Sequence, residues 1–232
     1  MRLHRFFTTT DIGNVHAGMV VTISDPHITH QLSKVLRAKI GDPVAFFDGQ
    51  GIAINGDIVE LQKNTITLLV KEQKKHQRPK KITILYLAML KRENFELAVQ
   101  KATEIGISAI VPLLTERTIK TGFNRTRIEK IIIEAAEQSG RVFVPTLYEP
   151  KSFIQACKEI QTLKLFLDFD GTHFENVLKK TKDTVALYVG PEGGWTDTER
   201  ALAKEAGCIA TTLGTLTLRA ETAAIVGSYL II

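Results

Sequence analysis

The first part of the chain consists of short apolar runs separated by turn residues. The runs lie at residues 19–23, 44–47, 52–59 and 65–70. The triplet Asn55-Gly-Asp57 inside the third run predicts a hairpin turn. One short helix is predicted over residues 27–36. Short strands with a single helix are typical of a small β-barrel.

Beyond residue 81 the pattern alternates between continuous apolar runs and helical spacing. The continuous runs, which are typical of strands buried on both faces, lie at residues 82–90, 109–114, 163–167, 185–189 and 208–213. Apolar positions recur at helical spacing over residues 95–105, 128–135, 196–206 and from Glu221 onward. Strands that alternate with helices predict an α/β fold whose parallel sheet is covered on both faces.

The positive charge of the chain is concentrated in one short segment. The net charge is +5, and residues 1–72 and 82–232 each contain as many acidic as basic residues. The excess lies in residues 73–81, which hold five Lys or Arg and no acidic residue. Because such a run cannot be buried, we predict a domain at 1–72, a linker at 73–81 and a second domain at 82–232. The linker is either a solvated hinge or a contact for a polyanion such as RNA.

Composition excludes several classes of protein. Apolar residues make up 44% of the chain and charged residues 24%, so it can bury a core and is not a disordered tail. No window approaches the roughly 18 apolar residues of a membrane helix, and no apolar signal segment is visible at the N-terminus. Two cysteines cannot build a disulfide framework or a four-cysteine zinc site. We therefore expect a cytoplasmic protein with no membrane contact and no metal site.

Two glycine-containing loops carry the candidate chemistry. The first, Val189-Gly-Pro-Glu-Gly-Gly-Trp195, follows a predicted strand and precedes a helix in which Thr196 and Glu199 have capping-box spacing. Glycines in this place let the backbone approach a ligand, although an ordinary tight turn is an equal alternative. The spacing matches neither the dinucleotide-binding motif G-x-G-x-x-G nor the Walker phosphate loop.

The second loop, Leu213-Gly-Thr-Leu-Thr-Leu-Arg219, also lies between a predicted strand and a predicted helix. Arg219 and Glu221 place opposite charges at the start of an otherwise apolar helix, where the helix dipole alone would favour the glutamate. Open α/β sheets bind ligands at the C-terminal ends of their strands. We therefore expect the two loops to form one ligand site.

Several segments, taken in order along the chain, resemble the RsmE-type ribosomal RNA methyltransferases of the SPOUT superfamily. The most specific are Gly190-Pro-Glu-Gly-Gly194 and Leu218-Arg-Ala-Glu-Thr-Ala223. The others are Val35-Leu-Arg37, Gly41-Asp, Phe47-Asp-Gly49, Phe95-Glu-Leu-Ala-Val-Gln-Lys-Ala-Thr-Glu-Ile-Gly106, Thr115-Glu-Arg117 and Glu137-Gln-Ser-Gly-Arg141. The chain departs from the family pattern at Trp195, Leu216 and Thr217; the family usually has an arginine in place of Leu216.

This resemblance implies a fold and a reaction. The expected fold is an N-terminal PUA-like β-barrel followed by a SPOUT α/β domain, whose C-terminal segment threads a trefoil knot. The expected reaction is transfer of a methyl group from S-adenosylmethionine to N3 of one uridine of 16S ribosomal RNA, numbered 1498. The resemblance also implies that the protein is a homodimer and that its substrate is 16S rRNA or the small ribosomal subunit.

The donor pocket is expected to be mainly apolar, with backbone groups contacting the adenine. The residues expected to line it are Leu167, Val189, Gly190, Glu192, Gly193, Gly194, Leu213, Gly214 and Leu218. The alternative for Leu167 and Leu218 is plain core packing, which is the more common role of such a residue taken alone. Glu192 either faces the positive charge of the donor or is an exposed turn residue.

Two further groups of residues are assigned to catalysis and to RNA. The N3 atom of uracil carries a proton that must leave during transfer, so Arg219 is a candidate for holding the uracil oxygens. Glu221 is a candidate proton acceptor or a structural residue of the helix start. The RNA-binding candidates are Arg2, Arg5, Lys34, Arg37, Lys74, Lys75, Arg78, Lys80, Lys81 and Arg141. Arg141 is a candidate either for RNA phosphate or for a dimer contact.

Two rival functions remain possible at this stage. An RNA-binding protein without catalysis would leave both glycine loops without a purpose. A nucleotide-dependent enzyme would need a Lys-Ser or Lys-Thr pair after the glycines, and the chain has none there.

Overall fold

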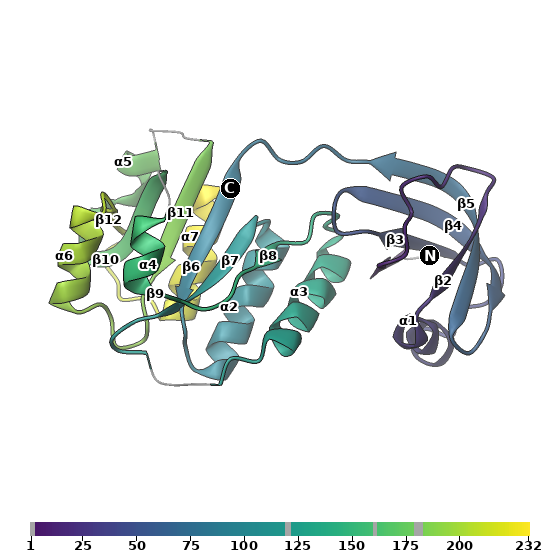
Figure 1. Cartoon of the computed structure of the whole chain (residues 1–232), viewed down its shortest axis with the longest axis horizontal. Helices are drawn as coiled ribbons and strands as arrows, with labels where there is room; N and C mark the ends of the chain where they lie inside the picture. The colour runs from purple at the N-terminus through teal and green to yellow at the C-terminus, as the bar shows by residue number, and fades with distance from the viewer. Residues whose placement is uncertain (1–2, 119–121, 160–161, 179–182) are drawn as a thin grey trace. The chain divides into compact units, whose positions relative to one another are not determined.

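The computed structural model describes residues 3–118, 122–159, 162–178 and 183–232. The chain divides into two compact units, drawn in Figure 1. Unit 1 comprises residues 1–78 and 136–144, and unit 2 comprises residues 79–135 and 145–232. This division differs from the expected boundaries in two places. Residues 73–75 continue a strand instead of forming a linker, and residues 136–144 join unit 1 although they follow much later in the sequence.

Unit 1 is built on a five-stranded sheet of order β1-β3-β4-β5-β2. Its elements are β1 (His4–Phe7), β2 (Val20–Ser24), α1 (Pro26–His30), the π-helix η1 (Gln31–Val35), β3 (Pro43–Phe47), β4 (Ile52–Leu61) and β5 (Thr65–Lys75). β1 and β3 are parallel, and the other pairs are antiparallel. Within the described residues the edge strands β1 and β2 do not pair with each other, so the closed barrel remains a prediction.

The hairpin expected at residues 55–57 is wrong. β4 runs without interruption through this triplet, and the register with β5 shifts between Asn55 and Gly56. A Cβ atom on Gly56 would lie 2.6 Å from the carbonyl oxygen of Leu69. The glycine is therefore required where two strands approach closely at a bulge, and not because the chain reverses there.

Residues 137–144 are fastened to unit 1 by hydrogen bonds. The Phe7 amide donates to Glu137 Oε1 at 2.9 Å, and the Val144 amide donates to the Gly49 carbonyl at 2.9 Å. Phe143 forms a bridge with Gln50. The Glu137-Gln-Ser-Gly-Arg141 motif therefore packs against the sheet of unit 1.

Unit 2 contains a parallel sheet of order β12-β10-β11-β6-β7-β8, with β9 paired to β7. Its strands are β6 (Ile82–Ala88), β7 (Ala109–Leu114), β8 (Thr146–Leu147), β9 (Lys151–Ser152), β10 (Leu163–His173), β11 (Thr184–Val189) and β12 (Ile209–Thr212). The helices are α2 (Arg92–Ile105), α3 (Arg125–Ser139), α4 (Phe153–Lys158), α5 (Phe174–Leu178), α6 (Asp197–Glu205) and α7 (Ala220–Ile231). The expected α/β fold with a parallel sheet is confirmed.

Helices cover both faces of this sheet (Figure 1). α2 and α7 pack against each other, and α7 also packs on β6 and β11. On the other face, Phe153 of α4 and Ala203 of α6 pack with Tyr86, Phe166 and Tyr188. Residues thus alternate between the two faces along each strand, which is why the sequence shows continuous apolar runs.

The capping box expected at Thr196 and Glu199 is confirmed at the start of α6. Tyr86 and Tyr188 stack with ring centroids 4.4 Å apart, and burial raises the pKa of Tyr86 to about 12, so it stays neutral at physiological pH. Among the described residues, no helix combines the length and the apolar character that a membrane span requires.

Candidate active site

A cavity of about 740 Å³ lies in unit 2 at the carboxyl ends of β11 and β12. It is lined by the loop that follows β11, by the loop that follows β12, and by Leu167, Asp168 and Phe169 in the middle of β10. The two loop-bearing strands are not neighbours, because β10 lies between them in the sheet. The loops nevertheless meet at one edge of the sheet, since the carboxyl ends of parallel strands lie on the same side.

All but one of the expected donor residues line this cavity. They are Leu167, Val189, Gly190, Glu192, Gly193, Gly194, Leu213 and Leu218, and the exception is Gly214. The two expected catalytic residues, Arg219 and Glu221, line it as well. The structure thus brings together residues from three strands that are far apart in the sequence.

The loop after β11 turns sharply and lies against an aromatic ring. Gly194 has φ +70°, a conformation that favours glycine, and its amide donates to the Pro191 carbonyl at 2.8 Å. A Cβ atom on Gly190 would lie only 2.8 Å from the indole of Trp195. Position 190 therefore has no room for any side chain.

Arg117 holds this loop from the turn after β7. Its Nη1 donates to the Gly193 carbonyl at 2.7 Å and to the Trp195 carbonyl at 3.4 Å. Glu199, which is buried, supports the same region, because its Oε1 accepts from the Glu116 amide at 3.0 Å and its Oε2 from the Thr196 amide at 2.9 Å. Sequence reasoning did not assign a role to Arg117, although the Thr115-Glu-Arg117 segment formed part of the resemblance.

Glu192 reaches away from the loop to the start of α2. Its Oε1 accepts from the Lys91 amide at 3.0 Å and from Asn94 Nδ2 at 3.5 Å. The carboxylate therefore satisfies a free amide at a helix start, and its side chain is exposed at the rim of the cavity. This is closer to the turn-residue interpretation than to a close contact with the donor.

The loop after β12 is held more loosely. Thr212 Oγ1 donates to the Gly214 carbonyl at 2.9 Å and accepts from the Gly214 amide at 3.4 Å. Gly214 has φ +145°, which only glycine adopts readily. Leu216, at the tip, is 79% exposed. Leu218 lines the cavity and is half-buried.

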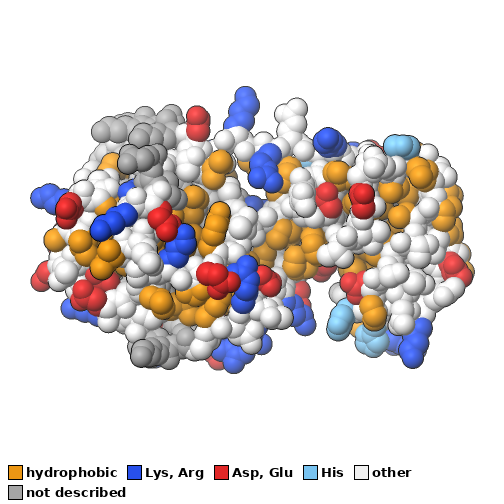
Figure 2. All heavy atoms as spheres, in the orientation of Figure 1, with side chains coloured by type: hydrophobic (Ala, Val, Ile, Leu, Met, Phe, Trp, Pro, Cys, Tyr) orange, Lys and Arg blue, Asp and Glu red, His pale blue; other side chains and the backbone are white. Residues whose placement is uncertain are grey.

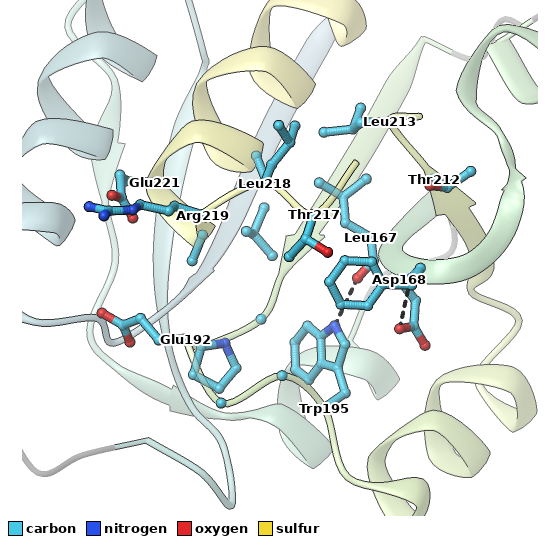
Figure 3. Close-up of a pocket in the computed structure, with 18 of the residues that line it drawn as sticks. Leu167, Asp168, Glu192, Trp195, Thr212, Leu213, Thr217, Leu218, Arg219 and Glu221 are labelled. Carbon is cyan, nitrogen blue, oxygen red and sulfur yellow. Dashed lines mark hydrogen bonds between the residues drawn. The ribbon is translucent and has the colours of Figure 1, made fainter. Parts of the chain in front are cut away.

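Trp195 lies at the base of the pocket, a role that sequence reasoning did not assign to it. Its Nε1 donates to the Leu167 carbonyl at 2.9 Å, as Figure 3 shows. Its ring stacks on Phe166 with centroids 4.5 Å apart, and Phe153 lies 4.8 Å away. The Leu167 side chain points to the opposite face, toward Gly227 of α7. Leu167 therefore serves both the core and the pocket.

A second group missed by sequence reasoning is the Asp168–Arg200 ion pair. Arg200 Nε lies 2.7 Å from Asp168 Oδ2, and Nη2 lies 3.3 Å from Oδ1. Asp168 raises the pKa of Arg200, chiefly through this hydrogen bond. The pairing of β10 with β12 shifts between Leu167 and Thr172, and the resulting bulge turns Asp168 toward the cavity.

Arg219 and Glu221 lie on the same side of the pocket, away from Trp195 (Figure 3). Arg219 is the N-cap residue of α7 and is exposed, whereas Glu221 in the first turn is only 6% exposed. Glu221 Oε2 is buried and has no hydrogen-bond partner within the described part of the chain. An unpaired buried carboxylate oxygen is unusual in a folded protein, and here it belongs to a residue that lines a cavity.

The RNA-binding candidates do not form one group. Arg2 lies outside the described residues. Lys74 and Lys75 belong to β5, and Arg5, Lys34, Arg37, Arg78 and Lys80 are exposed. Lys81 lies in unit 2, where its Nζ donates to the Ile232 carbonyl at 3.4 Å. On the face seen in Figure 2, Lys and Arg side chains are scattered among Asp and Glu side chains instead of forming one patch.

Arg141 has a structural role in unit 1. Its Nε donates to the Phe143 carbonyl, the residue is half-buried, and burial lowers its pKa to about 10. Neither expected role, in phosphate binding or in a dimer contact, is favoured by this position. The described residues contain no group of three His, Cys, Asp or Glu side chains placed to hold a metal ion.

Known proteins match this chain over most of its length. The sequence profile described as "RNA methyltransferase domain" matches residues 76–231. The chain belongs to this family. The expected family and the expected methyltransferase class are thereby confirmed.

Individual relatives agree with this assignment. The Rickettsia conorii protein named "Ribosomal RNA small subunit methyltransferase E" is 31% identical over 88% of this chain and 86% of its own length. The Synechocystis protein of the same name is 36% identical over 84% of this chain and 67% of its own length.

Solved structures of two methyltransferases are similar to this RNA methyltransferase over nearly all of both chains. The Neisseria gonorrhoeae ribosomal RNA small subunit methyltransferase E, bound to S-adenosyl methionine, has a TM-score of 0.88 and 29% identity, covering 98% of this chain and 95% of its own. The methyltransferase Lpg2936 from Legionella pneumophila, also with bound cofactor, has a TM-score of 0.86 and 29% identity, covering 100% and 97%.

Proposed function

We propose that this RNA methyltransferase transfers the methyl group of S-adenosylmethionine to N3 of uridine 1498 in the 16S rRNA of the small ribosomal subunit. The observation that carries the proposal is the cavity between the two glycine loops, in a chain whose relatives with a known structure bind S-adenosyl methionine. The names of the curated relatives support small-subunit ribosomal RNA as the substrate.

The residues of the cavity fit such a donor. Gly190, Gly193 and Gly194 have no side chains, so a ligand in the cavity can contact the backbone there. Leu213 and Leu218 supply apolar walls. The buried, unpaired Oε2 of Glu221 favours a ligand that brings either positive charge or a hydrogen-bond donor. The proposed donor contacts are the expected residues that line the cavity, Leu167, Val189, Gly190, Gly193, Gly194, Leu213 and Leu218, with Glu192 at the rim.

S-adenosylmethionine supplies a methyl group activated by a sulfonium cation. The chain itself must deal with the N3 proton of uracil, and two residues serve this purpose in the proposal. Glu221 accepts the proton, because its free oxygen is the unsatisfied acceptor that the described part of the cavity offers. Arg219 is exposed at the same side of the cavity, where its paired donors hold the uracil oxygens and stabilise the anion.

The remaining expectations about fold belong to the same proposal. β12 lies at the edge of the sheet beyond β10, yet α7 packs on β6 and β11. Residues 213–219 must therefore pass β10, and we propose that they thread the trefoil knot of a SPOUT domain there. Unit 1 is proposed to be a PUA-like module that binds RNA.

A homodimer is proposed from the outer surface of α7. Val226, Tyr229, Leu230 and Ile232 are between 37% and 70% exposed, and Leu97 of the neighbouring α2 is 41% exposed. Exposed apolar residues gathered on two packed helices mark an interaction surface. Light scattering is expected to give twice the chain mass of 25.8 kDa. A particle of 25.8 kDa at micromolar concentration would contradict the dimer. The proposed place of action is the cytoplasm.

The proposal is tested on the protein and in cells. Calorimetry is expected to show binding of S-adenosylhomocysteine to the purified protein, and mass spectrometry is expected to show one lost uridine methyl in 16S rRNA from cells that lack the gene. An RNA-binding protein without catalysis would bind no S-adenosylhomocysteine. Unchanged rRNA methylation in those cells would overturn the assigned reaction.

The roles of Glu221 and Arg219 are separated by substitution. Glu221→Gln and Arg219→Gln are each expected to lower turnover by about 10²-fold or more, with RNA affinity largely kept. Glu205→Gln is a matched control, because Glu205 is exposed on α6 and does not line the cavity. A Glu221→Gln protein with full turnover would show that Glu221 is only a structural residue.

A further inference from the structure

The outer face of the unit 1 sheet carries a row of polar side chains. Residues that pair across strands point to the same face, and the register places Arg5, Ala45, Asn55 and Glu72 in one row across β1, β3, β4 and β5. The next row contains Phe7, Phe47, Ala53 and Lys74. The core of the unit lies on the opposite face, with Phe6, Phe46 and Ile54.

Residues 137–144 form a wall beside these rows. Gly140 has φ +75°, and a Cβ atom there would lie 3.6 Å from the guanidinium of Arg5. The hydrogen bond from the Phe7 amide to Glu137 fixes the wall next to β1. This segment therefore packs beside Arg5. It includes the Gln-Ser-Gly-Arg turn, which has no assigned role in the proposed reaction.

The rows and the wall enclose a cleft of about 210 Å³ within unit 1. Its floor contains the small side chains of Ala45 and Ala53, and its charged or ionisable lining residues are Arg5, Lys74 and His76. Among the described residues, no carboxylate lines it. The three nitrogen-bearing groups come from β1, from the end of β5 and from the residue that follows β5.

We propose that this cleft binds a backbone phosphate of the RNA substrate, held between Arg5 and Lys74. The inference rests on the proposed function and adds to it a specific contact in unit 1. A guanidinium and an ammonium that line one small cleft, with no carboxylate in its described lining, match the charge of one phosphate group. The neighbouring amide of Asn55 and the ring of His76 complete the polar lining.

One carboxylate competes with the phosphate from just outside the cleft. Glu72 Oε1 lies 3.1 Å from Lys74 Nζ, and Glu72 Oε2 accepts from Asn55 Nδ2 at 3.3 Å. Both charged side chains of the pair are about half exposed, at 58% and 47%, so the pair is weak and a phosphate can displace it. Removing the Glu72 charge should therefore strengthen RNA binding, which is an effect that ordinary loss of contacts does not produce.

The experiment measures binding of the full-length protein to a 16S rRNA fragment that contains the target uridine, over a series of salt concentrations. Arg5→Gln and Lys74→Gln are each expected to weaken binding by about tenfold and to reduce the salt slope by about one. The matched control is Lys71→Gln, because Lys71 is also on β5, is 63% exposed and is paired with Asp57 at 2.6 Å, but does not line the cleft. It is expected to change affinity by less than about twofold.

The opposite charge change gives a second, independent result. Glu72→Gln is expected to tighten RNA binding by about threefold, while the control Glu60→Gln, an exposed carboxylate of β4 outside the cleft, changes it less. Thermal unfolding of each variant verifies that it is folded, and affinity for S-adenosylhomocysteine is expected to stay unchanged in all of them.

Two outcomes separate this inference from the proposed function. If wild-type protein methylates the fragment but Lys74→Gln and Lys71→Gln weaken binding equally, the cleft assignment is overturned and the proposed function stands. If wild-type protein neither binds nor methylates the fragment or isolated small ribosomal subunits that lack the modification, the proposed function falls and the cleft proposal falls with it.

Discussion

The two loops that form the cavity differ in how firmly the rest of unit 2 holds them. The loop after β11 is fastened from outside by Arg117, by the Trp195–Leu167 hydrogen bond, and by Glu192 at the start of α2. Within the described residues, the loop after β12 shows only local hydrogen bonds, two between Thr212 and Gly214, and has an exposed tip at Leu216.

This difference indicates that the two loops have different roles in ligand binding. A wall that is already in its final shape loses little entropy when a ligand binds, whereas a loop with few tethers can adjust to the ligand and to the substrate that follows it. We therefore expect the β11 loop to determine donor affinity. The β12 loop, which leads into Arg219 and Glu221, is expected to tolerate change near its tip.

The largest effect is expected from Gly190→Val. A side chain at this position would collide with the Trp195 indole, which is itself packed on Phe166 and has nowhere to move. Overpacking of this kind costs about 1–3 kcal/mol of stability. The strain is relieved by shifting the loop that lines the cavity, so we expect affinity for S-adenosylhomocysteine, measured by calorimetry, to fall by roughly a hundredfold. Gly122→Val is the control, because a Cβ atom at Gly122 meets nothing within 4 Å. Normal donor affinity in a folded Gly190→Val protein would show that the β11 loop does not form the donor pocket.

A smaller loss is expected from Arg117→Met, which keeps the length of the side chain and removes its bonds to the Gly193 and Trp195 carbonyls. Charged hydrogen bonds of this kind contribute about 1.5 kcal/mol, so donor affinity should fall about tenfold. Turnover at saturating donor should change much less, because Arg117 positions the wall and not the reacting groups. A fall in turnover with unchanged donor affinity would instead place Arg117 among the catalytic residues.

Gly214→Ala tests the looser loop. Its φ of +145° is unfavourable for alanine, and such strain costs of the order of 1 kcal/mol when the chain can relax. Donor affinity is expected to fall about fivefold. Gly207→Ala is the control for backbone strain alone, since Gly207 has φ +77°, has open space around it and lies between α6 and β12, outside both loops of the cavity. A loss as large as that of Gly190→Val would mean that the two loops are equally rigid.

The smallest effect is expected from Leu216→Ser. The side chain is 79% exposed, and surface changes of this kind alter stability by less than about 0.5 kcal/mol. Thermal unfolding and donor affinity should match those of wild type within error. A clear loss of donor affinity would show that Leu216 folds over the ligand when the loop closes.

The local pattern of apolar residues was sufficient to predict most strands of the parallel sheet. It was not sufficient to predict the order of those strands in the sheet. The run at residues 109–114 coincides with β7, and the predicted Thr196–Glu199 box begins α6. The position of β10 between β11 and β12 depends on how the crossovers pass over the sheet, and no short window contains that information. The error at Gly56 has a similar cause, because the partner that requires the glycine is a carbonyl on another strand.

The candidate site could be predicted where one short segment contains both glycines that shape a loop and side chains with a chemical role. The glycines after β11 and the residues Arg219 and Glu221 were identified in this way, and they line one cavity. Arg117 and Asp168 were missed, because their roles depend on partners at Gly193 and Arg200 that are distant in sequence. A charge count alone also could not distinguish Lys74, which lines the cleft in unit 1, from the adjacent candidate Lys75, which does not.

The position of Trp195 provides a built-in optical probe. It is the only tryptophan in the sequence, it is 2% exposed, and its indole donates to a carbonyl of the pocket. Excitation at a wavelength selective for tryptophan therefore collects emission from a single place beside the cavity in which the donor is proposed to bind. Titrations and rapid-mixing measurements of donor binding can be carried out on the unlabelled protein, with each change in intensity assigned to one ring.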